Sequence, residues 1–445
     1  MKITSKKAWV VSVEMGYGHE RAAYGLKDLA YGEIVVANKY PGIPKKDKIL
    51  WQRSRRLYET ISRFKAIPLV GEVIFEVMDK LQSIPQFYPR RDLSRPNLQL
   101  QQVYAMISKG TGQHLIEQLI AKNKKLPLIA TFFQVAFAAE EFGYPGEIYC
   151  VICDADCSRA WAPLDPKKSR IKYFAPNGRV VERLKLYGVR PENIYLTGFP
   201  LPKELIGGTR ITTIKQDLAR RLRNLDPNKI FLTKYEKTIA SYLGRGWRQL
   251  DHKHLLTLTF AVGGAGAQKM IGTEIVKSLR QQIAQGKIRL NLVAGVRRDV
   301  AQFFLQGCRS CGLKKYINQG VKVLFDPNHD RYFAAFSKIL HTTDILWTKP
   351  SELSFYTGLG LPIIMAPPVG SQEQFNRLWL KTVGSGISQN NPKYTNEWLF
   401  DWLNSGGLAR VAWNGFIEAP THGTYRIESI ITGQPIEVEK LPLIV

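Results

Sequence analysis

Short runs of hydrophobic residues alternate along this chain with segments whose hydrophobic positions recur at helical spacing. The apolar runs are rich in Val, Ile, Phe and Tyr and are bounded by turn-forming residues, which is typical of buried strands. Strands are expected at residues 8–13, 126–133, 147–153, 171–177 and 193–198, and again at 255–264, 289–296, 321–326, 344–349 and 361–368. Helices are expected between them, among others at 21–30, 134–142, 179–189, 271–285, 299–312, 331–339 and 351–360.

This alternation favours βαβ units and parallel, doubly wound sheets, so the expected fold class is α/β with two Rossmann-like domains. A length of 445 residues also exceeds one ordinary core. A Pro/Gly-rich stretch followed by basic helical segments marks the connection. The predicted organisation is an N-terminal domain at 1–200 with a basic aromatic insertion at 45–110, an inter-domain connection at 201–255, a C-terminal domain at 256–435 and a tail at 436–445. Two such halves place the expected ligand site in a cleft between them, at the C-terminal ends of the strands.

The chain is also strongly basic. The chain has 63 Lys and Arg against 37 Asp and Glu, a formal net charge of +26. Such a field attracts polyanions, which include nucleic acid, an anionic membrane face and phosphate-rich substrates. A basic surface that is simply solvated is the alternative, and composition does not choose between membrane and nucleic acid.

Membrane contact, if present, is expected to be peripheral. The N-terminal apolar run is short and leads into a glycine turn, so no secretory signal is expected, and no stretch approaches about 18 uninterrupted apolar residues. The five cysteines form two groups, Cys150/Cys153/Cys157 and Cys308/Cys311. Their spacing invites a zinc interpretation, but the groups lie in different predicted domains and strand alternation sends Cys150 and Cys153 to opposite faces, so reduced thiols and no metal are expected.

The first candidate motif directly follows the first strand. Gly16 and Gly18 allow a sharp turn and close approach of a ligand, and the helix that follows offers N–H groups to an anion. Arg21 stands where a dinucleotide fingerprint has its third glycine, so that fingerprint is absent. His19 at this helix start can contact an acceptor or a phosphate, although a histidine beside a turn also serves structure.

A second glycine turn opens the second half. Gly263, Gly264 and Gly266 precede Gln268 and a helix, which makes a phosphate cradle, or else a tight strand–helix turn. The Lys-Ser/Thr of a P-loop is absent, so nucleotide hydrolysis is not implied.

Three further loops of the same half, at 348–353, 360–362 and 370–376, follow its strands. Ser351 and Glu352 stand at a helix start, where a carboxylate can accept both hydroxyls of a ribose. Gln372 and Glu373 follow the next strand and can hydrogen-bond a hexose. Polar groups at helix starts are often caps, but three such loops in register indicate a binding site.

Together these motifs resemble the glycosyltransferase family that contains the monogalactosyldiacylglycerol synthases, bacterial diacylglycerol glucosyltransferases and the peptidoglycan lipid-intermediate N-acetylglucosaminyltransferase (glycosyltransferase family 28-like). The resemblance covers nearly the whole chain. Its segments are 16–23, Cys153-Asp154 to Trp161, 198–200, 263–268 and the GLP…GxQExxN pattern at 360–376. It implies the GT-B architecture of two facing Rossmann-like domains, inversion at the anomeric carbon and no catalytic metal.

The resemblance also implies roles for individual residues. Acceptor-side residues would be Gly16, Gly18, His19, Trp51 and Trp161. Donor-side residues would be Gly263, Gly264, Gly266 and Gln268 at the diphosphate, Ser351 and Glu352 at the ribose, and Gln372 and Glu373 at the sugar, with Asn376 supporting that loop. Lys349 and Arg297 are the expected cations near the leaving group, and His19, then Asp154, are the candidate bases.

Two departures from the family pattern bear on catalysis. A His-Pro-x-Trp segment in the lipid synthases corresponds here to Ser158-Arg159-Ala160-Trp161, without the histidine. The helix glutamate that binds ribose in those enzymes corresponds to Phe355, with Glu352 one turn earlier as a substitute.

The insertion at 45–110 suggests how an acceptor enters. Trp51, Leu57, Tyr58, Ile61 and Phe64 share one broad helical side, with Arg53, Arg55, Arg56 and Arg63 around it. A basic amphipathic helix with aromatics can rest on anionic lipid, and it can equally pack on the sheet.

The sequence therefore predicts a cytoplasmic, peripheral membrane enzyme that transfers a hexosyl group from a nucleotide-diphosphate sugar, such as a UDP-sugar, to a lipid or lipid-linked acceptor. A sugar-nucleotide epimerase and a binding protein that has lost catalysis are the alternatives on the same fold. A nucleic-acid binder is disfavoured because no finger, RNP-type or helix-turn-helix signature accompanies the charge.

Overall fold

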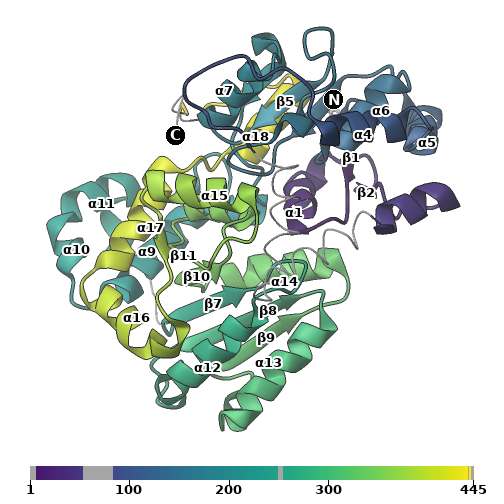
Figure 1. The fold of residues 1–445 in the computed structure, drawn as a ribbon. Coiled ribbons are helices and arrows are strands. Elements are labelled where there is room, and N and C mark those ends of the chain that lie inside the picture. Colours follow the sequence, from purple (N-terminus) through teal and green to yellow (C-terminus); the bar gives the residue numbers. More distant parts are fainter. Residues whose placement is uncertain (1–6, 54–83, 249–253, 439, 442–445) are drawn as a thin grey trace, which may run out of the picture. The chain divides into compact units, whose positions relative to one another are not determined.

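The computed structural model describes residues 7–53, 84–248, 254–438 and 440–441. The chain divides into two compact units (Figure 1). Unit 1 comprises Met1–Pro202, Val369–Asn376 and Pro420–Val445, and unit 2 comprises Lys203–Pro368 and Arg377–Ala419. Each unit holds a six-stranded sheet whose pairings are all parallel, which confirms the prediction of two Rossmann-like α/β domains.

The sheet of unit 1 has the strand order β2-β1-β3-β4-β5-β6. The chain moves from β1 to β2 on one side, then crosses back to β3 and continues on the other side. The order therefore reverses between β1 and β3, and doubly wound sheets bind ligands at the carboxyl ends of such a pair. The strands are β1 (Trp9–Ser12), β2 (Val35–Val36), β3 (Leu128–Ala130), β4 (Ile148–Val151), β5 (Lys172–Ala175) and β6 (Ile194–Leu196).

The central strands of unit 1 are apolar along their length because they are buried on both faces. Helix α7 begins where the Asn177 side chain accepts a hydrogen bond from the N–H of Val180. The helices of unit 1 are α1 (Tyr17–Gly25), α4 (Leu98–Ile107), α5 (Gln113–Asn123), α6 (Phe133–Glu141), α7 (Gly178–Leu186) and α18 (Gly423–Thr432), and residues 45–53 are helical as well. Its 3-10 helices are η1 (Lys27–Leu29), η2 (Arg159–Trp161) and η3 (Pro191–Asn193).

The sheet of unit 2 repeats this plan with the order β12-β11-β10-β7-β8-β9. Its order reverses between β7 and β10. The strands are β7 (Thr257–Ala261), β8 (Arg289–Gly295), β9 (Val321–Phe325), β10 (Ile345–Thr348), β11 (Ile363–Met365) and β12 (Gly386–Ser388). The predicted parallel series of the second half is thus present.

Helices α12 and α13 pack against each other and against β8 (Figure 1). The α-helices of unit 2 are α8 (Lys203–Ile206), α9 (Thr212–Leu225), α10 (Ile230–Lys234), α11 (Glu236–Leu243), α12 (Lys269–Ala284), α13 (Arg298–Ser310), α14 (His329–Leu340), α16 (Thr395–Asn404) and α17 (Gly407–Glu418). Helix α15 (Ser371–Thr382) begins in unit 1 and ends in unit 2. The 3-10 helices are η4 (Arg245–Arg248), η5 (Lys314–Tyr316), η6 (Glu352–Leu359) and η7 (Pro392–Tyr394).

The observed division of the chain differs from the expected one in two places. The C-terminal residues from Pro420 return to unit 1, where Arg426 of α18 donates a hydrogen bond to the carbonyl of Thr197 at 3.1 Å. The stretch expected as a connection belongs to unit 2 from Lys203 onward, and there buried Arg221 of α9 donates to the carbonyls of Thr343 and Leu359. Both differences rest on contacts between residues far apart in the sequence, which local periodicity does not report.

The segment predicted as a helix at 351–360 is the 3-10 helix η6. All eight of its residues are buried, so it has no solvent-facing side to give it the polar stripe of an amphipathic α-helix. Gly360, with a φ of 68°, ends it in the left-handed conformation.

Candidate active site

His19 lies where the strand order of unit 1 reverses. It belongs to α1, which follows β1, and its Nδ1 lies 2.7 Å from the main-chain oxygen of Thr131, which follows β3. A carbonyl oxygen only accepts hydrogen bonds, so Nδ1 carries the proton and donates. In the neutral ring Nε2 is then the nitrogen with a lone pair that can accept a proton.

Burial keeps the His19 ring neutral. Desolvation lowers the pKa of His19 from its ordinary 6.5 to about 4, and the hydrogen bond to Thr131 offsets only part of that effect. The ring packs edge-on against Phe132 with 4.9 Å between centroids, and the Trp161 ring lies 6.0 Å away. At neutral pH His19 is therefore an uncharged proton acceptor held in one orientation.

The turn that presents His19 depends on glycine. Gly16 is the N-cap of α1 and has a φ of 115°, a conformation that residues with a Cβ rarely adopt. Gly18, in the first turn of α1, is half-buried. Trp161 is 6% exposed and packs on Phe133 with 5.1 Å between ring centroids. Gly16, Gly18 and Trp161 thus surround the histidine within one unit.

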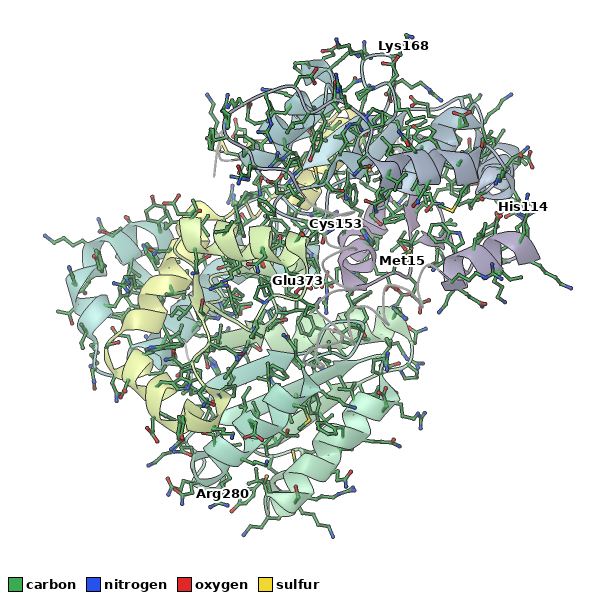
Figure 2. The ribbon with its side chains drawn as sticks, viewed as in Figure 1. Met15, His114, Cys153, Lys168, Arg280 and Glu373 are labelled. Carbon is green, nitrogen blue, oxygen red and sulfur yellow. The ribbon has the colours of Figure 1, made fainter. Side chains whose placement is uncertain are left out.

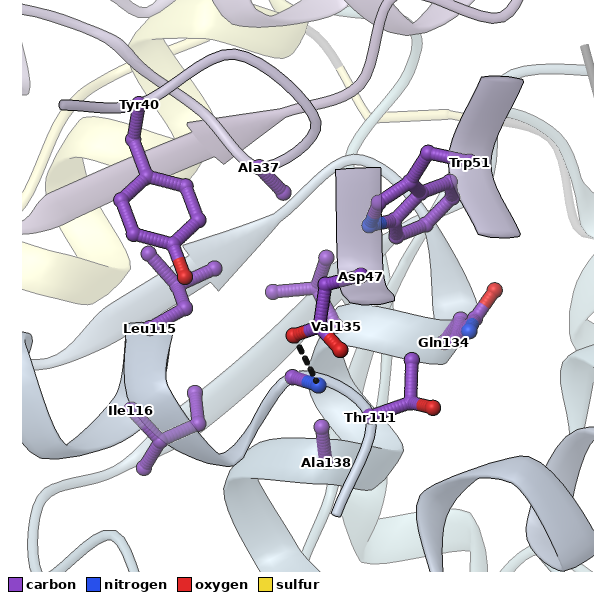
Figure 3. A pocket seen from close by; sticks show the side chains of 11 residues that line it. Ala37, Tyr40, Asp47, Trp51, Thr111, Leu115, Ile116, Gln134, Val135 and Ala138 are labelled. Carbon is purple, nitrogen blue, oxygen red and sulfur yellow. Dashed lines mark hydrogen bonds between the residues drawn. The ribbon is translucent and has the colours of Figure 1, made fainter. Parts of the chain in front are cut away.

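Trp51 packs into unit 1 instead of lying on its surface. Its side chain is 7% exposed, and its ring lies 6.1 Å from that of Phe132. Together with Asp47 it lines a cavity of about 10 Å³, roughly the room for one water molecule (Figure 3). At this position the helix packs on its domain, which is the second interpretation given above. The rest of the predicted membrane-facing helix lies beyond residue 53, outside the described residues.

Asp154, the second candidate base, is engaged by hydrogen bonds. It follows β4, and its Oδ1 accepts from Nδ2 of Asn376 at 2.8 Å. Asn376 has no exposed surface, and its Oδ1 accepts from the N–H of Ala155 at 2.7 Å. The structure therefore brings together two predicted site residues that are far apart in the sequence.

The glycine turn of unit 2 lies at the reversal between β7 and β10. Gly263 and Gly264 follow β7 and are half-buried. Lys349 follows β10, and a Cβ on Gly263 would lie 2.6 Å from its Cε. A Cβ at position 263 would therefore displace the end of the Lys349 side chain from this place. Lys349, one of the two predicted cations, therefore lies close to the predicted diphosphate site.

Gly266 and Gln268 complete this turn, and Arg297 lies beside it. Gly266 has a φ of 68°, and the position of a Cβ on it would be 3.9 Å from Cζ of Arg297. Arg297 donates two hydrogen bonds to Asp299, at 3.0 and 3.2 Å, and thereby holds the pKa of that carboxyl below its ordinary value. Gln268 is the N-cap of α12, and its Nε2 donates to the carbonyl of Pro367 at 2.7 Å. Gln268 thus connects the end of the turn to the loop that follows β11.

The expected ribose residues stand at the start of η6. Ser351 is its N-cap and Glu352, 7% exposed, is its first residue. Phe355, which occupies the position of the family's ribose glutamate, is 1% exposed and packs on Trp379 with 5.0 Å between ring centroids. Phe355 therefore serves the core, and Glu352 stays the candidate for the ribose.

Gln372 and Glu373 belong to unit 1, although the sequence places them after a strand of the second half. Glu373, labelled in Figure 2, is 8% exposed, and its Oε2 accepts from the N–H of Val369 at 2.6 Å. Gln372 is half-buried. Glu373 therefore shapes its own loop as an N-terminal cap of α15.

Sequence analysis missed a buried ion-pair network beside this loop. Asp156 has no exposed surface, and its two carboxylate oxygens accept from Nε and Nη2 of Arg183 at 2.8 and 2.9 Å. Arg179 donates to the same carboxylate at 2.7 Å. Two arginines one helical turn apart after an Asp-containing loop are the only signal of this network in the sequence.

No metal site was found among the residues that the structure describes: they contain no group of three or more His, Cys, Asp or Glu placed to hold an ion. The five cysteines all lie in the described ranges, and none of them forms a disulfide. Cys153, labelled in Figure 2, lies beyond the end of β4, so the expected alternation of Cys150 and Cys153 within one strand does not apply. No described helix is long and apolar enough to cross a membrane.

The chain has a distant relative along most of its length. It is 23% identical over 400 residues to a processive diacylglycerol beta-glucosyltransferase of Bacillus licheniformis, covering 87% of this chain and 84% of the relative. A family model described as a domain of unknown function (DUF6938) matches residues 244–425.

Solved structures give weaker matches. A UDP-GlcNAc 2-epimerase from Neisseria meningitidis bound to UDP-GlcNAc has a TM-score of 0.46 and 12% identity, covering 77% of this chain and 83% of that chain. MurG of Acinetobacter baumannii has a TM-score of 0.42 and 13% identity, covering 74% and 78%. Matches at this level do not assign an activity.

The sequence relative supports the resemblance that the motifs indicate, and the parallel sheets match the fold class expected from it. The chain is thus similar to the GT-B glycosyltransferases that include the diacylglycerol glucosyltransferases, of which it is a distant relative.

Proposed function

We propose that this protein transfers a hexosyl group from a UDP-sugar to the hydroxyl of a lipid or lipid-linked acceptor, with inversion at the anomeric carbon. The observation that carries the proposal is the state of His19, a neutral imidazole with Nδ1 fixed on Thr131 at the ligand-binding end of a doubly wound sheet. Diacylglycerol-type lipids are the first acceptors to test, because the relative's name specifies diacylglycerol.

The proposed reaction is a single displacement. The acceptor oxygen forms a bond to the anomeric carbon while the bond from that carbon to the diphosphate oxygen breaks, and Nε2 of His19 takes the acceptor proton. A pKa of about 4 makes His19 a weak base, so the proton is transferred late. By then the partly bonded oxygen is far more acidic than a free alcohol.

In this proposal, groups of unit 2 stabilise the negative charge on the leaving UDP. Backbone N–H groups of the 263–268 turn and the N-terminal end of α12 suit a diphosphate. Lys349, close to Gly263, and Arg297, close to Gly266, supply positive charge there. Glu352 is proposed at the ribose, and Gln372 and Glu373 at the hexose. No step in this scheme requires a metal ion.

Membrane contact follows from the acceptor, because a lipid hydroxyl is presented at a bilayer surface. The net charge of +26 favours an anionic leaflet. We therefore propose a peripheral protein at the cytoplasmic face of a membrane and no role in nucleic-acid binding. Anionic vesicles should bind the protein in a salt-dependent manner, and tighter binding to an oligonucleotide than to vesicles would contradict this assignment.

The test is a screen of nucleotide sugars by thermal shift, followed by turnover of the best donor with lipid extracts. The expected result is a UDP-sugar that raises the melting temperature and a glycolipid product whose anomeric proton shows the inverted configuration by NMR. Conversion of the donor to an epimer without acceptor would identify an epimerase instead. Binding without any conversion would identify a protein that has lost catalysis.

A further inference from the structure

The segment 369–376 belongs to unit 1, although the residues before and after it in the sequence belong to unit 2. It contains the first half of α15, up to Asn376, and the second half of that helix lies in unit 2. It also carries Gln372 and Glu373, the residues proposed for the donor hexose. What fixes this segment to unit 1 therefore sets where those residues lie relative to His19, which belongs to the same unit.

The side chain of Asn376 makes the most specific of these contacts. Its Nδ2 donates to Oδ1 of Asp154 at 2.8 Å, and its Oδ1 accepts from the N–H of Ala155 at 2.7 Å. The carboxylate only accepts and the N–H only donates, so the amide fits in one orientation. Because Asn376 has no exposed surface, bulk water cannot take the place of either hydrogen-bond partner.

Two neighbouring contacts hold the same segment. The Phe375 ring lies 5.4 Å from Cζ of Arg179, which also donates to Asp156 at 2.7 Å. The carboxylate of Glu373 closes the segment by accepting from the N–H of Val369. The segment is thus tied to the loop after β4 and to α7 by both polar and cation–π contacts.

We propose that Asp154 is a positioning residue that, through Asn376, holds the donor-sugar segment 369–376 in register with His19. This assignment rests on the proposed function, and it replaces the alternative that Asp154 is the base. Its Oδ1 aligns Asn376, and the aligned segment presents Gln372 and Glu373 to the hexose.

The two assignments predict opposite results for conservative changes. In Asp154→Asn the new amide can present its oxygen to Nδ2 of Asn376 and keep the hydrogen bond, whereas a base would lose its function. In Asn376→Asp two carboxylates meet at hydrogen-bond distance, which disfavours the segment's position. The double variant Asp154→Asn/Asn376→Asp restores both bonds, because the amide introduced at position 154 donates and the carboxylate introduced at position 376 still accepts from Ala155.

The experiment compares kcat/KM for the donor and unfolding temperature in the wild type, both single variants and the double variant. The proposal predicts a fall of less than about fivefold for Asp154→Asn, of about 10–100-fold for Asn376→Asp, and recovery in the double variant to within about fivefold of Asp154→Asn. A fall of about 100-fold or more in Asp154→Asn that persists in the double variant would overturn it.

Asn224→Asp is the matched control. Asn224 donates to Asp344 at 2.9 Å in unit 2, so this variant also brings two carboxylates together away from the segment, with His254 in contact with both side chains. It should lower the unfolding temperature and leave donor kcat/KM within about twofold. Failure of the wild type to transfer any hexose would contradict the proposed function. Unfolding temperatures would then test the contact between Asp154 and Asn376 by itself. A double variant that regains the lost stability supports this contact, and a double variant no more stable than Asn376→Asp contradicts it.

Discussion

Replacing and titrating His19 tests the physical basis of the proposed chemistry. Burial lowers its pKa from 6.5 to about 4, which corresponds to about 3 kcal/mol of preference for the neutral ring. Because the folded pKa lies below the unfolded one, this contribution to the free energy of unfolding is complete above pH 6.5. It is lost as the pH falls towards 4, where the unfolded chain has already taken up the proton.

Histidine labelled with ¹³C at Cε1 allows the pKa to be measured directly by NMR. The His19 signal is the one that is lost in His19→Asn. It should stay in its neutral position down to about pH 5 and titrate near pH 4. His114, which hydrogen-bonds Tyr40 through Nδ1 at 3.0 Å, supplies a comparison signal in the same unit, identified by its loss in His114→Asn.

Alanine variants of the same two histidines test the predicted tautomer through activity. His19→Ala should lower turnover by about 10²–10⁴-fold and leave UDP binding within about threefold, because the ring acts on the acceptor proton and not on the nucleotide. His114→Ala should keep turnover near that of the wild type. A His19 signal that titrates near 6.5, or near-normal turnover of His19→Ala, would refute the reasoning.

Three other substitutions test parts of the account. Gly263→Ala places a Cβ 2.6 Å from Cε of Lys349, so UDP affinity by calorimetry should fall about tenfold or more, while Gly246→Ala, with open space around the Cβ, should leave it unchanged. Arg183→Met breaks a pair in which both side chains are fully buried and should lower the free energy of unfolding by about 3–5 kcal/mol in urea; a loss below about 1 kcal/mol would contradict the network. Gly198→Ala combines a φ of 89° with a Cβ 2.8 Å from Pro420, so α18 should become more accessible to protease than in the wild type.

The sequence predicts the alternation of strands and helices well because most strands are short, largely apolar runs, although β2 and β12, of two and three residues, were not predicted. It also places both glycine turns correctly after β1 and β7. Residue spacing cannot show that the chain crosses back at Pro420, because α18 is held by contacts such as Arg426 with Thr197 across 229 positions. Such pairings are properties of the folded chain.

The candidate site shows the same limit. His19 is visible as a histidine after a glycine turn, but its partner is a main-chain oxygen 112 residues away, and a backbone acceptor leaves no mark on residue type. The desolvation that sets its pKa comes from the packing around it, including Phe132, which the motifs do not include. Asp154 and Asn376 were each predicted as site residues, but their contact, and hence the positioning role proposed for Asp154, required the structure.

The most direct test of the central claim is a crystal structure of the protein with UDP. The claim is that the glycine turn at the strand reversal of unit 2 binds a nucleoside diphosphate. The diphosphate should lie on the backbone N–H groups of residues 263–268 with Lys349 beside it. UDP bound elsewhere, or a clear turn with no nucleotide at saturating UDP, would contradict the account.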